Sequence, residues 1–541
     1  MRKISVLILC LILALSAACN KELKDQLAEL QDRKTALEEK VSELPEAAEI
    51  QPSDFCITFD NEDCWVDAGC SAKVHYSLDI PAKVEASSEH GWSVEVTPSS
   101  DNEGDVIITA PDPASPGIVK VKATNSNGYT TETFSQLFVR KPYGTVASPR
   151  IEAMAYNGLT DDLATPEHFR KMAEAGFTMV SVEGEDEIYG PGWRNQCIQA
   201  AEAGIKVVLF IGWTWERWTY DPEHFTGLDD LINEAETYPA ICAYQIADEP
   251  TTYLAPTLAK VKAKINQLAP DHPVYINLHP SSVSQAGMGA VTYEEYVECF
   301  ASVCDLQFIT FDHYPLFTYG IEDCWYRSLN AVYDTAKRHG IPFWAFLLSC
   351  REWGRVEPSL ENIRLQGNMN LTYGAQVNQF FVYRSTSGTE QAPLQTWKWK
   401  DGIPGGTKVG MVQYTPFYDY CKEYCREMHN REFVFAGSDV RKVRHTGNNY
   451  YLHGECLSTA DLPEAISDIT TYDSAAVSFI GNSGNEYVVI CNKAYDKKLP
   501  VSVTFTREVY TIDREGEFAL QQPGNTLFTI DEGDMLVIKW K

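Results

Sequence analysis

The sequence has few basic residues for its length and almost no long apolar runs. It contains 45 Lys and Arg against 75 Asp and Glu, a formal net charge of −30 over 541 residues. Nucleic acid requires a basic footprint and anionic lipid attracts basic segments, so both partner classes are disfavoured. After the first 20 residues no segment is long and apolar enough to cross a bilayer. The composition suits a self-repelling body outside the cell, and the length predicts several domains.

Motifs of metal, cofactor and nucleophile sites are also missing. No CxxC pair has a partner and no HExxH occurs, so we expect no metal and no cofactor. No GxGxxG follows a strand-like segment, which disfavours a doubly wound fold. No GxSxG elbow marks a serine hydrolase. Nothing in the sequence favours Cys350 as a thiol nucleophile with His279 or His313.

Residues 1–18 have the pattern of a secretory signal. Two basic residues precede the apolar stretch Ile4–Leu15, which is too short to span as a mature helix. The stretch Leu15-Ser16-Ala17-Ala18-Cys19 then resembles the lipobox of bacterial lipoproteins. The resemblance implies cleavage before Cys19, lipidation of Cys19 and anchoring to the outer membrane, at the cell surface or on its periplasmic face. An ordinary secretory signal is the alternative.

The 15 cysteines are unevenly placed along the chain. Thirteen remain once the signal cysteine and lipidated Cys19 are set aside, so at least one stays unpaired. Cys242 and Cys491 lie in apolar, strand-like segments and are expected to be small buried side chains. Three others cluster near the N-terminus and could hold one disulfide: Cys56, Cys64 and Cys70.

We predict four segments after the signal. Residues 19–48 carry the lipid and a charged helical stalk, whose leucine spacing would allow a coiled-coil oligomer. Period-two alternation over 50–142 predicts an immunoglobulin-like β-sandwich. It resembles spacer modules of surface lipoproteins of gut Bacteroidetes, and a carbohydrate-binding module is the alternative. A barrel domain spans 148–432, and a C-terminal β-sandwich spans 433–541.

The barrel prediction rests on eight alternations of strand and helix patterns. Thr165 before Pro166 marks a helix start, and Gly204 and Gly340 each close a helix just before a strand. Strands rich in Val, Ile and Phe suit a parallel sheet buried on both faces, and eight units fit an (α/β)₈ TIM barrel. The predicted strands are Ile151–Asn157, Thr178–Glu183, Lys206–Trp213, Ile241–Ala247, Val274–His279, Leu306–Asp312, Phe343–Ser349 and Val377–Tyr383.

The predicted strand ends are polar, acidic and aromatic, and catalytic groups of such barrels lie there. Asp248 and Glu249 end the fourth strand, and Pro250 forbids its continuation. Aromatic faces pack against the C–H faces of sugar rings, so the aromatic residues predict a carbohydrate platform. The candidate substrate-binding residues are Asn157, Glu183, Trp213, Trp215, Trp218, His279, Asp312, Tyr314, Trp353 and Tyr383.

Three stretches resemble the large clan of retaining (α/β)₈-barrel glycoside hydrolases. They are Asp248-Glu249-Pro250, the lead-in Pro239–Tyr244, and Asp312-His313-Tyr314-Pro315. The resemblance implies that Glu249 is the general acid/base. The chemistry agrees, because glycosidic cleavage requires a protonated carboxyl beside the leaving oxygen. The clan places a nucleophilic Glu at the end of strand seven, where this chain has Ser349, so Glu352 is the nearest candidate.

Other functions remain open from the sequence. The Asp248–Glu249 pair also resembles β-hexosaminidases, in which the Asp orients the substrate's own 2-acetamido group as nucleophile. A catalytically dead, glycan-binding lipoprotein is another candidate, supported by the missing strand-seven Glu. A structural or assembly protein built on the stalk is the last, and it predicts no cleft. No sugar, linkage or stereochemistry follows from these residues.

Overall fold

The architecture was obtained as a computed structural model. It describes residues 57–59, 63–67, 71–88, 91–110, 117–126, 128–140, 150–160, 162–184, 192–212, 227–352, 354–386, 391–400, 407–447 and 454–540. Several predictions lie outside these ranges: the signal, lipidated Cys19 and the stalk, Cys56 and Cys70, and the aromatic candidates Trp213, Trp215, Trp218 and Trp353.

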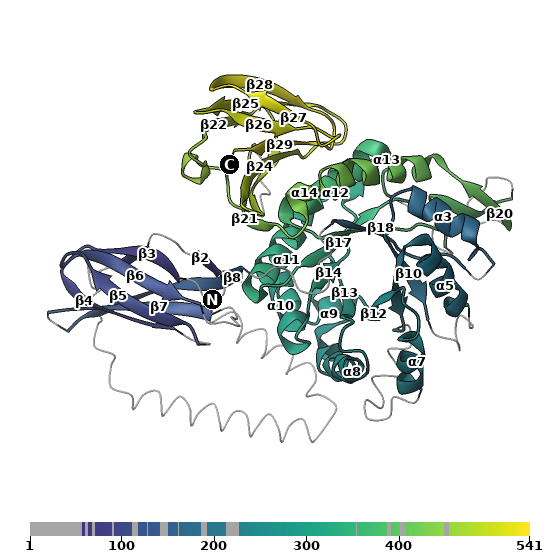
Figure 1. Cartoon of the computed structure of the whole chain (residues 1–541), viewed down its shortest axis with the longest axis horizontal. Coiled ribbons are helices and arrows are strands. Elements are labelled where there is room, and N and C mark those ends of the chain that lie inside the picture. The colour runs from purple at the N-terminus through teal and green to yellow at the C-terminus, as the bar shows by residue number, and fades with distance from the viewer. Residues whose placement is uncertain are drawn as a thin grey trace, which may run out of the picture.

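The N-terminal domain is an immunoglobulin-like β-sandwich, as predicted (Figure 1). Its sheets have the strand orders β1-β3-β6-β5 and β2-β8-β7-β4, which correspond to the two sheets of an immunoglobulin domain. Val106, Val119 and Val121 are fully buried between them. The strands are β1 (Ile57–Phe59), β2 (Asp63–Asp67), β3 (Ser71–Leu78), β4 (Ala82–Ser88), β5 (Ser93–Pro98), β6 (Glu103–Thr109), β7 (Gly117–Asn125) and β8 (Thr130–Arg140).

Eight parallel strands form a closed barrel, which confirms the predicted TIM barrel. Their order around the barrel follows the chain, and the last strand pairs with the first. Each strand lies within or beside a predicted segment. They are β9 (Glu152–Ala155), β10 (Met179–Glu183), β11 (Lys206–Phe210), β12 (Ile241–Asp248), β13 (Val274–Leu278), β14 (Ile309–Phe311), β17 (Phe343–Leu348) and β18 (Val377–Phe381).

Helices surround the barrel strands (Figure 1). Thr165 caps its helix by accepting from the backbone of His168, with Pro166 at the first position, and Gly204 and Gly340 are left-handed C-caps, as predicted. The helices are α3 (Pro166–Glu174), α5 (Trp193–Ala203), α7 (Leu228–Ala235), α8 (Ala255–Leu268), α9 (Gln285–Met288), α10 (Tyr293–Val303), α11 (Trp325–His339), α12 (Leu360–Tyr373), α13 (Pro416–Asn430) and α14 (Glu432–Phe435).

Two hairpins interrupt the alternation of strand and helix. The first, β15 (Leu316–Phe317) with β16 (Gly320–Ile321), stands between β14 and α11. The second, β19 (Leu394–Trp399) with β20 (Lys408–Tyr414), follows β18. Both therefore extend from the ends of barrel strands, where loops shape the sites of this fold.

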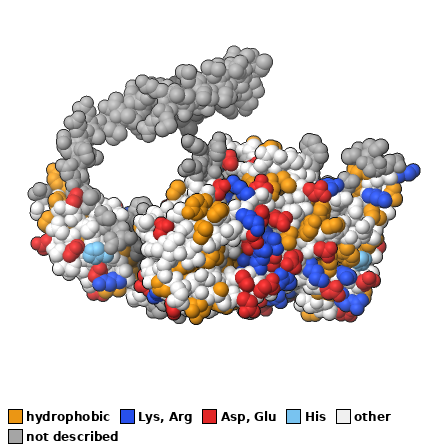
Figure 2. All heavy atoms as spheres, turned by 90° about the horizontal axis from the view of Figure 1, so that it is seen from above, with side chains coloured by type: hydrophobic (Ala, Val, Ile, Leu, Met, Phe, Trp, Pro, Cys, Tyr) orange, Lys and Arg blue, Asp and Glu red, His pale blue; other side chains and the backbone are white. Residues whose placement is uncertain are grey.

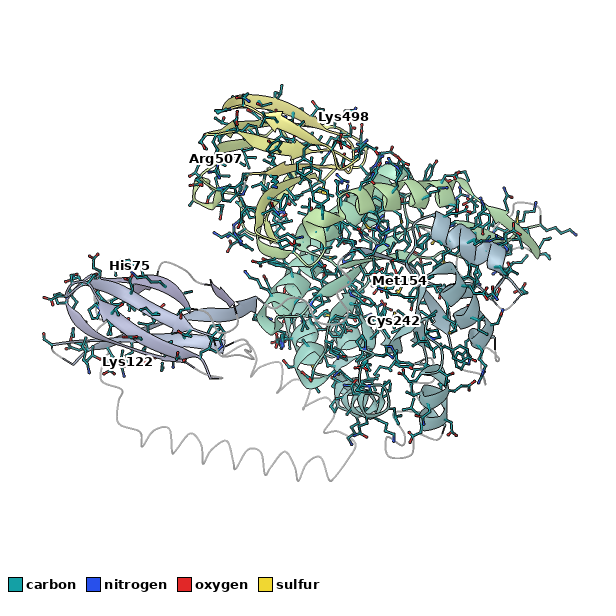
Figure 3. The ribbon with its side chains drawn as sticks, in the orientation of Figure 1. His75, Lys122, Met154, Cys242, Lys498 and Arg507 are labelled. Carbon is teal, nitrogen blue, oxygen red and sulfur yellow. The ribbon has the colours of Figure 1, made fainter. Side chains whose placement is uncertain are left out.

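The barrel has two apolar layers. Outside the strands, a large cluster that includes Phe169, Ile265 and Leu329 fills the space toward the helices. Inside, Met154, Tyr275, Trp344 and other side chains form a separate packed core. Figure 3 shows Met154 and Cys242 among the barrel strands. The filled interior directs any site to the strand ends.

The C-terminal domain is a β-sandwich of a six-stranded and a three-stranded sheet. Several bonds join it to the barrel helices: Tyr333 and Lys337 donate to the carbonyls of Val440 and Arg441, and Asn368 donates to that of Gly533. Its strands are β21 (Asp439–His445), β22 (Ile466–Thr471), β23 (Ala475–Asn482), β24 (Asn485–Asn492), β25 (Leu499–Phe505), β26 (Val509–Ile512), β27 (Phe518–Gln521), β28 (Gly524–Ile530) and β29 (Met535–Lys539).

Surface charge and cysteine state agree with the composition. One face shows acidic and basic side chains side by side rather than in areas of one sign (Figure 2). Within the described ranges, no helix combines the length and apolar character that a membrane crossing requires. Cys491 is fully buried as predicted, whereas Cys242 is only partly buried. Both are free thiols, and burial raises the pKa of each to about 12, so both behave as inert side chains.

Candidate active site

The end of β12 carries two consecutive carboxylates. Asp248 is the last residue of the strand, and Glu249 follows with a φ of 48°, a left-handed conformation that is uncommon for a residue with a side chain. The backbone N–H of Glu249 donates to the carbonyl of Asn277 on β13 at 2.9 Å. The strained turn is thus held by the neighbouring strand, which is typical of functional positions.

His279 is the basic side chain in contact with Glu249. Its Nδ1 lies 3.2 Å from Glu249 Oε1. The His279 backbone is fixed by two helix α10 residues, because its N–H donates to the Tyr296 hydroxyl and its carbonyl accepts from Tyr293. The Tyr296 hydroxyl also donates to the carbonyl of Pro250. One tyrosine therefore ties the ends of β12 and β13 together beside the Glu249–His279 contact.

Asn277 connects the carboxylates of two strands. Its Nδ2 donates to Asp248 at 2.9 Å and to Asp312, just after β14, at 3.4 Å. Asn277 in turn accepts from the Thr310 hydroxyl, which accepts from Gln379. These bonds continue into the buried barrel interior, so the site stands on a chain of polar side chains with few alternative positions.

The ionisation of Glu249 and that of Asp312 influence each other. Burial raises the pKa of Glu249, but the hydrogen bond and charge of His279 and a hydrogen bond from Asp312 outweigh it, so this pKa lies below its ordinary value. Burial, with the negative charges of Glu249 and Asp248, raises the pKa of Asp312 well above its ordinary value. The pKa values of these two neighbouring carboxyl groups are therefore shifted in opposite directions.

The third carboxyl group of the cluster is that of Asp248. Burial raises its pKa to about 6; the Asn277 hydrogen bond opposes the shift, and the Glu249 charge adds to it. Three carboxyl groups, two with a raised pKa and one with a lowered pKa, thus meet at the ends of two strands. Such separation is the usual mark of a site that performs acid/base chemistry.

Glu352 lies in the loop after β17, where the sequence places the second acid. Burial raises its pKa and the Arg355 charge opposes the shift. Its Oε2 is buried and has no hydrogen-bond partner among the described residues. Burial raises the pKa of Tyr314 well above its ordinary value, and the charges of Asp312, Asp248 and Glu352 add to the shift. Tyr314 therefore lies near the carboxylates at the ends of β12 and β14 and near that of Glu352 after β17.

Two further candidates lie at the ends of β9 and β10. Asn157 has a φ of 50°, and its backbone N–H donates to the Ser181 hydroxyl. Burial raises the pKa of Glu183, against the charge of Arg384, which follows β18 and donates to the carbonyl of Gly158. Glu183 and Arg384 thus form a second polar group at the same barrel edge.

Tyr383 and Cys350 are both buried in the barrel rather than exposed at the site. Tyr383 is fully buried, with its ring 5.3 Å from that of Phe177. Cys350 is also fully buried, and burial raises the pKa of its thiol to about 12, which disfavours a thiolate nucleophile.

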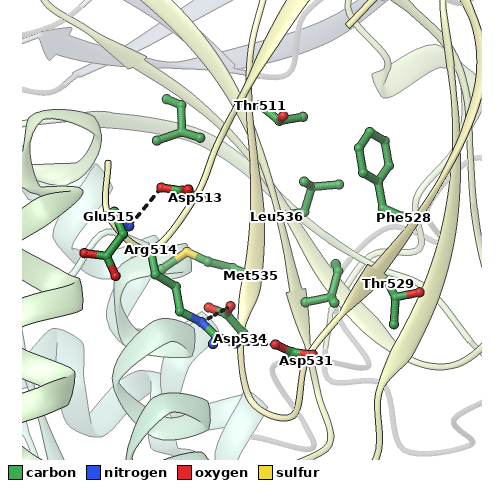
Figure 4. A pocket seen from close by; sticks show the side chains of 12 residues that line it. Thr511, Asp513, Arg514, Glu515, Phe528, Thr529, Asp531, Asp534, Met535 and Leu536 are labelled. Carbon is green, nitrogen blue, oxygen red and sulfur yellow. Dashed lines mark hydrogen bonds and ion pairs between the residues drawn. The ribbon is translucent and has the colours of Figure 1, made fainter. Parts of the chain in front are cut away.

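One pocket lies apart from these carboxylates, in the C-terminal sandwich. It has a volume of about 400 Å³ and is lined by residues of β26, β28, β29 and their loops (Figure 4). Its Arg514 is paired with Asp531 and Asp534, at 2.8 and 2.7 Å. Since this cation is already satisfied, the pocket offers less reactive chemistry than the barrel edge.

The polar residues that hold the site were not predicted from the sequence. Asn277, Gln245, Thr310 and Gln379 are buried in barrel strands, and Tyr156 accepts from Gln245 at 3.1 Å. Each interrupts an otherwise apolar strand segment, and that interruption is a signal that the sequence does contain. A buried polar residue in a central strand requires a partner, so it indicates an internal network.

Comparison with known proteins finds remote structural likeness. No family model and no curated protein matches the sequence. A GH27 β-L-arabinopyranosidase from Geobacillus stearothermophilus is 11% identical, with a TM-score of 0.43, over 74% of this chain and 97% of that chain. A glycosyl hydrolase family 2 member from Bacteroides cellulosilyticus (8% identical, TM-score 0.31) is matched over 90% of this chain and 74% of that one. A Bacteroides ovatus GH5 xyloglucanase (11% identical, TM-score 0.30) is matched over 69% and 99%. At such identities the activity has to be argued from this chain's own residues.

Proposed function

We propose that this protein is a glycoside hydrolase acting on a poly- or oligosaccharide outside the cytoplasm. One observation carries the proposal: Asp248 and Glu249 at the end of β12 and Asp312 just after β14, on either side of β13, have pKa values shifted in different directions. Hydrolysis of a glycosidic bond requires a carboxyl that gives and then takes a proton, and this cluster supplies one.

Glu249 is the acid/base of this proposal. Its side chain is more accessible than that of His279, which it contacts: 40% of the Glu249 side chain is exposed, against 15% of the His279 side chain. When a sugar covers Glu249, loss of water raises its pKa, so that Glu249 takes up a proton, and Asp312, whose own pKa is raised, is its donor in this proposal. Glu249 then protonates the leaving oxygen, and it later deprotonates the attacking water. His279 and Asn277 hold the pair in place as positioning residues.

Glu352 is the nucleophile of this proposal. It is the first acid after β17, its Oε2 has no partner among the described residues, and its charge is felt at Tyr314 together with those of Asp248 and Asp312. A carboxylate facing Glu249 at about 5 Å forms a covalent glycosyl intermediate and retains the anomeric configuration. A retaining mechanism is therefore the reaction that we propose.

Substrate assistance is the second candidate. Asp248 is aimed by the Asn277 hydrogen bond and lies beside Glu249, as required of a carboxylate that orients a 2-acetamido group. In that mechanism the enzyme needs no nucleophile of its own. Asp248→Asn would then abolish turnover of N-acetylated substrates.

The proposal includes the predicted surroundings of the enzyme. We propose that Cys19 is lipidated and anchors the chain to the outer membrane through the 19–48 stalk. We further propose that Trp213, Trp215, Trp218 and Trp353 offer sugar-stacking faces around the carboxylates. A protein that binds glycans without cleaving them is the competing outcome of the test below.

The test is a screen of the purified protein against a panel of defined glycans, with the product anomer followed by NMR from the first turnovers. We expect cleavage of at least one glycan, with retention. Binding without cleavage across the panel would favour the glycan-binding alternative. Release of the inverted anomer would remove Glu352 as a nucleophile and leave Glu249 as acid.

A further inference from the structure

Three side chains that could each ligate a metal ion lie together in the loop after β14, beginning next to Asp312. His313, Glu322 and Cys324 place one donor atom each within 4.8 Å of one another. The β15–β16 hairpin brings them together, because it returns the chain so that Glu322 N–H donates to the carbonyl of Pro315 at 2.8 Å. His313 is almost fully buried, whereas Glu322 and Cys324 are partly exposed.

The hydrogen bonds around His313 fix which nitrogen carries a proton. Ser281 Oγ lies 2.7 Å from the carbonyl of Cys324, so the Ser281 hydroxyl has to donate there. Ser328 Oγ lies 2.9 Å from Ser281 Oγ and therefore donates to it. Ser328 then has no hydrogen left for His313 Nδ1 at 2.8 Å, so Nδ1–H must be the donor in that contact.

The consequence lies at the other ring nitrogen. With its hydrogen on Nδ1, a neutral His313 presents the lone pair of Nε2 to Glu322 Oε2, only 3.0 Å away. Two facing lone pairs repel, so either a proton or a cation has to lie between these atoms. A histidine whose Nδ1–H is held by an oxygen, with Nε2 free, is the usual form of a metal-ligating imidazole.

We propose that His313, Glu322 and Cys324 bind one divalent transition-metal ion of the zinc type. Nitrogen, oxygen and sulfur donors together suit zinc, with a water as fourth ligand. Adjacent ligand atoms in such a site stand about 3.3 Å apart, close to the 3.0 Å between Nε2 and Oε2. The Cys324 thiol loses its proton to solvent on binding, so carboxylate and thiolate balance the 2+ charge of the ion.

The guanidinium of Arg355 lies near the cluster and is bound by other groups. Arg355 donates to the carbonyl of Tyr314 and stacks 3.6 Å above the ring of Phe317. The ion would join the β14 loop to the residue after the hairpin and to Cys324, the N-cap residue of α11. Because His313 directly follows Asp312, it would also fix the loop that carries one of the clustered carboxylates.

The test uses the full chain, stripped with a chelator and then mixed with Co²⁺ or Zn²⁺. We expect one metal ion per chain after gel filtration and a thiolate-to-cobalt charge-transfer absorption in the near ultraviolet. Cys324→Ser should remove that absorption, and Ser328→Ala should weaken metal affinity about 10- to 100-fold. Cys456→Ser, which changes an exposed free cysteine, is the matched control and should keep both signals.

A measurement on the unaltered chain keeps the proposal testable if a variant fails to fold. Zn²⁺ should slow alkylation of Cys324 at least 10-fold, read by peptide mass spectrometry, and leave Cys456 unchanged. Absence of stoichiometric metal would overturn the proposal. So would a cobalt absorption that survives Cys324→Ser, or equal protection of the two thiols. A proton would then be what lies between His313 and Glu322.

Discussion

The two acids proposed for catalysis are held in opposite ways. Glu249 stands directly on the end of β12, where its backbone bonds to β13 and its carboxylate contacts His279 and Asp312. Glu352 stands three residues beyond Ser349, and its buried Oε2 has no hydrogen-bond partner among the described residues. The same barrel edge therefore offers one acid fixed by three strands and one positioned by a loop.

The difference suggests a division of labour. Proton transfer depends on a pKa that neighbours set, and Glu249 has those neighbours. A nucleophile needs an unobstructed oxygen, and an oxygen bonded by protein donors is a weaker one. Glu352 meets this requirement because few groups compete for it. If the two acids differ in role as they differ in the contacts that hold them, their substitutions should have different consequences.

The largest expected effect is that of Glu352→Gly. If Glu352 is the nucleophile, kcat/KM on a substrate from the glycan panel should fall about 10⁴-fold. Added azide should restore turnover and give a glycosyl azide of inverted configuration, because the small anion occupies the space of the lost carboxylate. A loss below about tenfold, with no azide product, would exclude Glu352 and favour substrate assistance.

Glu249→Gln should have the second largest effect. The amide keeps the shape but cannot donate a proton to the leaving oxygen, so turnover should fall about 10²- to 10⁴-fold. Substrates with good leaving groups should lose less in the first step, which separates acid catalysis from binding. Glu298→Gln, on the outer helix α10, is the matched control and should leave turnover unchanged. Equal loss in both variants would point to misfolding instead.

Much of the fold could be predicted because its signals are local. Apolar strands, the Thr165–Pro166 helix start and the glycine caps each act within a few residues, and the structure confirms them. The hairpins β15–β16 and β19–β20 were not predicted. Their strands are short and lie inside loops, so neither hydrophobic period nor length distinguishes them from irregular chain.

The position of the candidate site could be predicted from the sequence, but the hydrogen bonds and pKa shifts within it could not. The ends of parallel strands meet at one edge of a barrel, so Asp248, Glu249 and Asp312 could be placed together from the sequence. The opposite pKa shifts of Glu249 and Asp312 depend on contacts between strands that are far apart in the chain, which no local pattern encodes. Asn277 was missed for the same reason, since its partners come from the neighbouring strands.

Asn277→Ala should have an intermediate effect. It removes the donor that lowers the pKa of Asp248, so that pKa should rise. The acidic limb of the kcat/KM profile should move to higher pH, with about tenfold lower activity at neutral pH. Asn378→Ala is the control, because Asn378 is equally buried in β18 but bonds to Asn370 and Tyr424 instead. A merely structural role for Asn277 would give both variants the same unshifted profile.

The smallest expected effect is on stability: Asp248→Asn should raise the free energy of unfolding. The folded chain holds the Asp248 proton up to a pKa of about 6, against an ordinary value of 3.8. Between these values the folded state binds more protons than the unfolded state, so the free energy of unfolding falls as pH rises. Above pH 6 the wild-type chain carries the full cost of burying ionised Asp248, which lowers its free energy of unfolding by about 2 to 3 kcal/mol at most.

The asparagine variant escapes that cost because it has no charge to bury. Its melting temperature should exceed that of the wild-type chain by a few degrees at pH 8, and the two should converge near pH 4, as followed by calorimetry. A variant less stable than wild type at pH 8 would show that ionised Asp248 gains more from Asn277 than burial takes away. The carboxylates at the end of β12 would then be held there by stability as well as by chemistry, and the contrast with Glu352 would narrow.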